Sequence, residues 1–127
     1  MRRYLAGALI LVVAACVNPF NPGRDITLPV RDLVVPASIP PGGPLSIRFN
    51  VVSGGCKSFE RVEARRGTNQ LTLEARGVDH GGPGISCTTD IRIDPQTYDA
   101  AGPFSDRFVV EVVQPDGSTL ARTVRVQ

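Results

Sequence analysis

The side chains best suited to chemistry in this chain of 127 residues are three cysteines and one histidine. Cys16 lies near the start, Cys56 and Cys87 lie in the main body, and His80 is the only histidine. A cysteine can carry a lipid, form a disulfide or ligate a metal as its thiolate. The neighbours of each cysteine, and the compartment that the chain reaches, decide among these chemistries.

Cys16 ends a short segment with the features of a secretory signal peptide. Two arginines at positions 2 and 3 precede an apolar stretch over residues 5–15, which finishes in small residues. A helix of that length spans about 16 Å, whereas the hydrocarbon core of a bilayer is about 30 Å thick. The segment is therefore too short for a good permanent transmembrane helix.

Residues 13–16, Val-Ala-Ala-Cys, resemble the lipobox of bacterial lipoproteins: an aliphatic residue, two small residues and a cysteine. The resemblance implies that residues 1–15 are cleaved as a signal peptide and that Cys16 is acylated, which anchors the chain in a membrane of the cell envelope. Val17 stands where an aspartate would favour retention at an inner membrane, so an outer membrane is favoured if one is present. Two alternatives stay open: cleavage by an ordinary signal peptidase, or an uncleaved short anchor.

With Cys16 assigned to lipid, Cys56 and Cys87 remain as a pair. Disulfides persist in the oxidising compartments that secreted proteins reach, so we expect these two residues to be bonded. Closing the loop between them would stabilise the fold by about 3–4 kcal/mol in the chain-entropy account. The alternative, a pair of metal-ligand thiolates, lacks partners because the chain has one histidine and no Cys-x-x-Cys.

Residues 80–84, His-Gly-Gly-Pro-Gly, are the one segment that invites a catalytic interpretation. They resemble the oxyanion-hole loop of some α/β-hydrolases, in which glycines turn N–H groups toward a developing oxyanion. The chain has no Gly-x-Ser-x-Gly, so we interpret this segment as a loop between strands. His80 with Asp79 and Asp90 or Asp94 is only a weak metal set. We predict no catalytic residue, no metal and no cofactor.

The chain expected after cleavage carries no net charge. Removing the two arginines of the leader leaves 12 of the 14 basic side chains against 12 acidic ones. No basic stripe remains that would indicate binding to nucleic acid. Residues 16–25 are short, polar and Pro-rich, so they predict a lipidated N-terminus and flexible tether. Residues 26–127 have the length of one domain.

From residue 26 onward, short runs of alternating apolar and polar residues are separated by turn residues, which is typical of half-buried strands. No segment shows a helical apolar period. Residues 45–51 alternate most clearly, and Pro-Asp-Gly at 115–117 predicts a hairpin. Arg122 interrupts the inward pattern after that hairpin, so either the face is open there or a bulge shifts the register. The predicted strands are 26–35, 45–51, 58–66, 71–75, 85–93, 108–112 and 120–126.

Seven short strands at this spacing predict an all-β, antiparallel sandwich that resembles immunoglobulin-like or fibronectin-like domains in strand count and size. Asp94 and Tyr98 have the Asp-x-x-x-Tyr spacing found before strand F of many immunoglobulin domains. The cysteine expected two residues later is Ala100, and the chain has no tryptophan. A small barrel or another sandwich is the alternative. A strand over 85–93 places Cys87 on an apolar face, where the bridge would be buried.

These features together predict a lipid-anchored envelope protein whose β domain is a non-catalytic binding or assembly module. Its partner would be another envelope protein, since a tether raises the local concentration of proteins on one membrane. The loops at 53–57 and 77–87 are the candidate contact surface. The alternative is an inhibitor of an envelope protease or a lysozyme-like enzyme. The charged segment 60–66 is interpreted as ion pairs on a solvated sheet face, with a recognition face as the alternative.

Overall fold

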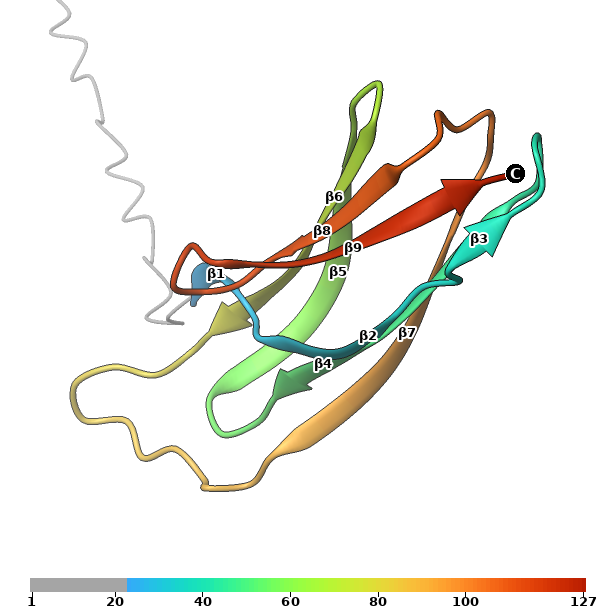
Figure 1. Ribbon diagram of the computed structural model, residues 1–127. Helices are drawn as coiled ribbons and strands as arrows, with labels where there is room; N and C mark the ends of the chain where they lie inside the picture. The colour runs from blue at the N-terminus through green and yellow to red at the C-terminus, as the bar shows by residue number, and fades with distance from the viewer. Residues whose placement is uncertain (1–22) are drawn as a thin grey trace, which may run out of the picture.

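The computed structural model describes residues 23–127 (Figure 1). Cys16 and the predicted signal segment lie outside the described residues. Residues 23–127 form only strands, turns and loops, so no helix among them could cross a membrane. The strands are β1 (Arg24–Thr27), β2 (Val30–Val34), β3 (Ser38–Ile39), β4 (Leu45–Ser53), β5 (Lys57–Arg66), β6 (Gln70–Asp79), β7 (Arg92–Ala100), β8 (Phe108–Val113) and β9 (Thr119–Val126).

The strands form two sheets of unequal width that pack face to face as a sandwich (Figure 1). The smaller sheet has the order β2-β4-β7, and both of its pairs are antiparallel. In the larger sheet, β6 pairs with β5 along one side. Along its other side, β6 pairs with β8 near its start and with β1 near its end. β9 and then β3 follow β8.

The predicted all-β class is confirmed, but the prediction of seven antiparallel strands is wrong. The strand expected over 26–35 is broken, because β1 pairs in the larger sheet while β2 pairs in the smaller one. The break falls at Pro29, which has no N–H to donate to a ladder. β3 is an additional short strand, and both β3–β9 and β6–β8 are parallel pairs. β1 also begins at Arg24, within the last two residues of the predicted tether.

The hydrophobic core lies between the two sheets and consists of alternate residues on their inner faces. On β4, Leu45, Ile47 and Val51 are fully buried, whereas the intervening Ser46 and Arg48 are exposed. Burying one such apolar side chain contributes about 1.5–3 kcal/mol. The largest fully buried side chains are Phe108, Leu28, Leu45, Ile47, Leu71, Leu73, Val51, Val110, Val112 and Val124.

The hairpin predicted around residues 115–117 is present as β8 and β9. Arg122 pairs with Val110 in an unbroken register and is exposed, so the sheet face is open at this position and there is no bulge. Gln114, at the end of β8, joins the two sheets. The Val30 N–H donates to Gln114 Oε1 at 3.1 Å, and Gln114 Nε2 donates to the Val30 carbonyl at 2.8 Å.

The two ends of the sandwich are built from different connections (Figure 1). We call one end the bridged end. There the start of β1 lies beside the end of β6, together with the β4–β5 turn and the β6–β7 loop. At the end called the far end lie the β3–β4 and β5–β6 turns, the β7–β8 connection and the C-terminus. Arg24 and Lys57 both pair with Asp79 at the bridged end, whereas Ser105 bonds Asn69 at the far end.

Arg66, the last residue of β5, closes the far end. Its guanidinium donates to the carbonyl oxygens of Ala101 at 3.1 Å and Pro103 at 2.8 Å. The same group lies 4.4 Å from the ring centre of Phe104 and 4.9 Å from that of Phe108. It therefore holds the β7–β8 connection against the core through two hydrogen bonds and two cation–π contacts.

We expect Arg66→Ala to lower the free energy of unfolding by about 1–2 kcal/mol, because it removes hydrogen bonds from a charged donor and the ring contacts. The matched control is the neighbouring Arg65→Ala, whose side chain lies on the opposite face of the sheet. Its effect should stay within about 0.5 kcal/mol, as for most surface substitutions. Urea denaturation measures both values, and equal losses for the two variants would contradict this role of Arg66.

Candidate functional site

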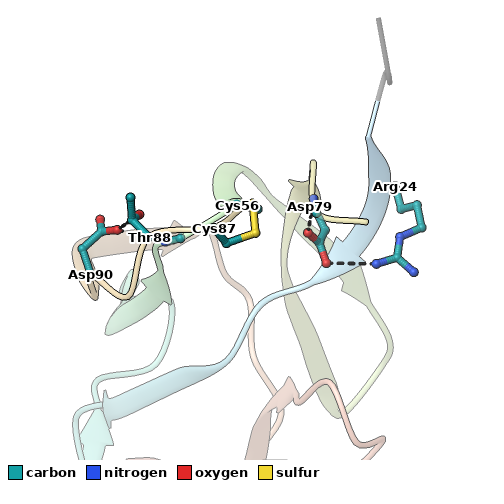
Figure 2. Close-up of a disulfide and its surroundings, with 8 residues drawn as sticks. Arg24, Cys56, Asp79, Cys87, Thr88 and Asp90 are labelled. Atoms are coloured by element: carbon teal, nitrogen blue, oxygen red, sulfur yellow. Dashed lines mark hydrogen bonds and ion pairs between the residues drawn. A yellow bond between two sulfur atoms is a disulfide. The ribbon is translucent and has the colours of Figure 1, made fainter. Parts of the chain in front are cut away.

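A disulfide between Cys56 and Cys87 dominates the bridged end (Figure 2). The Cα atoms lie 5.1 Å apart and the two residues are separated by 31 positions, which confirms the predicted pairing. The bond joins the β4–β5 turn to the β6–β7 loop, residues 80–91. The His80 N–H also donates to the Cys56 carbonyl at 2.9 Å, so the start of the loop is fixed to the same turn.

The prediction of a strand over 85–93 is wrong for its first part. β7 begins only at Arg92, and Cys87 is exposed rather than buried on an apolar face. Ile85 and Ile91 remain 44% and 74% exposed. Arg92 pairs with Ser53, the last residue of β4, so β4 offers no further residues with which the preceding segment could pair.

The β4–β5 turn holds the second half of the loop through its glycines. Gly54 has a φ of 123°, and a Cβ there would collide with the carbonyl oxygen of Asp90. The Gly55 N–H donates to Asp90 Oδ1 at 3.3 Å, and the hydroxyl of Thr88 donates to the same oxygen (Figure 2). These two hydrogen bonds, that of Thr88 above all, hold the pKa of Asp90 below its ordinary value of 3.8.

On the other side of the bridge, Asp79 organises the start of the loop. Its side chain is 14% exposed, and it accepts a hydrogen bond from the Gly81 N–H at 2.8 Å. Arg24 adds an ion pair at 3.1 Å (Figure 2). The Gly81 N–H, and after it the charges of Arg24 and Lys57, hold the pKa of Asp79 below 3.8, although partial desolvation acts in the opposite direction.

Two of the weak sequence candidates, Asp79 and Asp94, accept hydrogen bonds from groups of the protein itself. Asp79 bonds the Gly81 N–H, so this amide of the His-Gly-Gly-Pro-Gly segment is already occupied. Asp94 lies on β7, where it accepts a hydrogen bond from Ser53 at 3.5 Å. Within residues 23–127, no three His, Cys, Asp or Glu side chains gather as a metal site would require.

Two depressions flank the bridge, of about 280 Å³ and 380 Å³. Their walls are mostly glycine backbone and charged or polar side chains, unlike the apolar lining of typical small-molecule sites. The smaller is lined by Gly54, Gly55, Cys56, Lys57, Ser58, His80, Asp90 and Arg92, and the larger by Arg24, Gly54, Gly55, Cys56, Lys57, Asp79, Gly81, Gly82, Cys87 and Thr88.

The charged segment 60–66 contributes to an ion-pair network on the larger sheet. Arg61 bonds Glu63 at 2.9 Å and approaches Asp25 of β1 at 3.5 Å. Arg76 of β6 bonds the same aspartate at 2.7 Å. The interpretation of this segment as ion pairs on a sheet face therefore agrees with the structure.

Two kinds of residue at the bridged end were not predicted from the sequence. The role of Asp79 has a local signal, since an aspartate two residues before a glycine commonly bonds the backbone N–H of that residue. The exposure of Ile85 and Ile91 has no such signal, because their alternation resembles that of a buried strand.

Replacing both bridge cysteines, as Cys56→Ser with Cys87→Ser, should lower the free energy of unfolding by about 3–4 kcal/mol through the entropy of the opened loop. Chemical denaturation of the variant and of reduced wild type should give matching losses. Limited proteolysis should cut the variant first within residues 80–91. A variant as stable and as protease-resistant as the oxidised wild type would contradict this role of the bridge.

Acidification should weaken the bridged end through Asp79. A carboxylate whose pKa is lowered by folding contributes stability above its unfolded pKa, near 3.8, and that contribution is lost as the pH falls through the lower folded pKa. Asp79→Asn should therefore show a flatter loss of stability below about pH 4 than wild type in thermal melts.

Arg24→Gln is the matched comparison, because it removes the ion pair but keeps the Gly81 hydrogen bond. It should retain most of the acid dependence. If Asp79→Asn lost stability with falling pH as steeply as wild type does, the role of Asp79 would be contradicted. If Arg24→Gln lost as little stability as Asp79→Asn, the larger contribution of the Gly81 hydrogen bond would be contradicted.

Comparison with known proteins gives no relative for this arrangement. No protein-family model, curated protein or solved structure matches the chain.

Proposed function

We propose that this protein is an envelope lipoprotein, anchored by Cys16, whose β-sandwich is a non-catalytic binding or assembly module. The observation that carries the proposal is the Val-Ala-Ala-Cys at residues 13–16, placed directly ahead of a folded domain that begins at Arg24. A signal peptide with a lipobox implies export and an acylated N-terminus. The partner is another protein of the envelope, whose encounter a shared membrane would favour.

The arrangement of the bridged end supports binding more than catalysis. Asp79 and Asp90 both accept hydrogen bonds from backbone N–H groups of the same region. A catalytic acid or base needs a proton-transfer position within reach of a substrate, whereas these carboxylates organise the protein's own backbone. The site therefore provides a shaped surface with a fixed backbone.

For the fold, we propose a layout related to immunoglobulin-like domains. Counting β1, β2 and β3 as one broken opening strand gives the seven strands expected of such a sandwich. The parallel β6–β8 pair departs from their antiparallel sheets. Tyr98 also lies inside edge strand β7, rather than ahead of a strand as in the Asp-x-x-x-Tyr pattern.

An inhibitor of an envelope protease or lysozyme-like enzyme is the second candidate. The observation in its favour is loop 80–91, which extends beyond both sheets (Figure 1). The bridge at Cys87 and the contacts of Asp90 fix that loop to the β4–β5 turn. A loop held in this way on a rigid scaffold is a common vehicle for binding.

The lipid anchor is tested on protein purified from a bacterial envelope. Mass spectrometry should find a mature N-terminus at Cys16 that carries acyl chains, and Cys16→Ser should lose most of its membrane association. An unmodified mature chain that starts at another residue would overturn the anchor. Normal export of Cys16→Ser into the soluble fraction is the control for secretion.

The two candidate functions differ in their need for the anchor. Chemical crosslinking in the envelope should join the wild type to one specific membrane-associated protein, and Cys16→Ser should lose that product. An inhibitor would instead keep its complex with a hydrolase when released from the membrane. Inhibition of a protease or lysozyme by the released protein would favour the second candidate.

A further inference from the structure

We propose that the bridged end is a lipid-facing surface, with loop 80–91 resting at the headgroup boundary of the anchoring membrane and Ile85 and Ile91 inserted into it. The inference rests on the proposed anchor at Cys16 and assigns the bridged end to the lipid, so a protein partner would bind elsewhere on the domain.

The position of the anchor is the first argument. Cys16 precedes Gly23 by seven residues, a stretch that can reach at most about 25 Å when fully extended. β1 starts immediately afterwards, at the bridged end, where Arg24 pairs with Asp79. β6 has 10 residues and runs from the far end to this point, so it spans about 33 Å. The tether is therefore too short to let the domain turn its bridged end fully away from the membrane.

The exposed apolar side chains are the second argument. Only three large hydrophobic side chains are exposed among residues 23–127, and two of them, Ile85 and Ile91, lie in loop 80–91. Ile91 is 74% exposed. Single exposed apolar residues are ordinary on protein surfaces. Here two occur in the one loop beside the end of the tether, where contact with lipid would bury them.

The charges around the loop fit a lipid interface. Asp90 is the only Asp, Glu, Lys or Arg in residues 80–91, and its carboxylate is bonded to Thr88 and Gly55. Lys57 and Arg92 border the loop, and neither forms an ion pair within residues 23–127. Cations in such positions can extend to anionic headgroups while the apolar side chains enter the boundary.

The outer face of the larger sheet is less suited to that role. It carries the ion pairs of Arg76 with Asp25 and Glu74, at 2.7 Å each. Laying this face on the acyl boundary would desolvate that network of charges, which is costly. The domain should therefore stand on its bridged end rather than lie on this sheet.

The chain contains no tryptophan, so one introduced tryptophan reports on one position. The acylated mature protein, residues 16–127, carrying Ile91→Trp is reconstituted into vesicles of phosphatidylethanolamine and phosphatidylglycerol. Its tryptophan emission should lie to the blue of the emission of the same variant made unacylated by Cys16→Ser and measured in detergent-free buffer. Brominated acyl chains should quench it. Ile85→Trp should behave in the same way. Thr68→Trp, exposed at the far end, should show neither effect.

The outcomes separate this inference from the proposed anchor. Flotation of the protein with vesicles, without blue shift or quenching at residues 85 and 91, would overturn the orientation while leaving the anchor intact. Equal quenching at residue 68 would also overturn it, because the domain would then lie flat. Failure of the acylated preparation to float would overturn the anchor and this inference with it.

Discussion

Burial of one face of each sheet against the other is the interaction on which the rest of the structure depends. Hydrophobic burial is the dominant favourable contribution to folding, and it fixes which residues of every strand face inward. Leu45 and Ile47 of the smaller sheet and Leu73 and Val110 of the larger one are completely buried as a result. The ion pairs of Arg61 on the outer face are about half exposed, and each contributes little. Stability therefore resides between the sheets, which leaves the outer faces and the loops to serve binding.

A core confined between two sheets leaves both ends of the sandwich to be closed by other means. The far end uses a guanidinium, since Arg66 covers Phe104 and Phe108 and bonds two carbonyl groups. Loop 80–91 lacks buried apolar side chains, so hydrophobic burial cannot offset the entropy lost in ordering it. A covalent bond and the hydrogen bonds of Asp79 and Asp90 take that role at the bridged end.

The alternation of apolar and polar residues predicted the strands whose inner faces reach the core, such as residues 45–51, because successive side chains of a strand point to opposite faces. The same signal failed at residues 85–91, since a strand also needs a partner and β4 ends at Ser53. Parallel pairing of β6 with β8 depends on contacts between distant segments and leaves no local pattern, whereas the exchange of sheets between β1 and β2 has a local signal in Pro29. The disulfide was predictable from the number of thiols and the expected compartment, without geometry. The lipidation of Cys16 stays a prediction.

The edges of the two sheets constrain how a partner could bind. β5 pairs only with β6 among the described strands, and β7 only with β4, so both are sheet edges at which another chain could add a strand. β5 carries a series of charged residues over 60–66, and β7 contains Pro95, which has no N–H to donate. Charges and proline are the features by which natural edge strands resist such pairing. Strand addition at β5 or β7 is therefore disfavoured, and β2 and β3, which each pair with one strand only within residues 23–127, are the remaining edges at the ends of the two sheets.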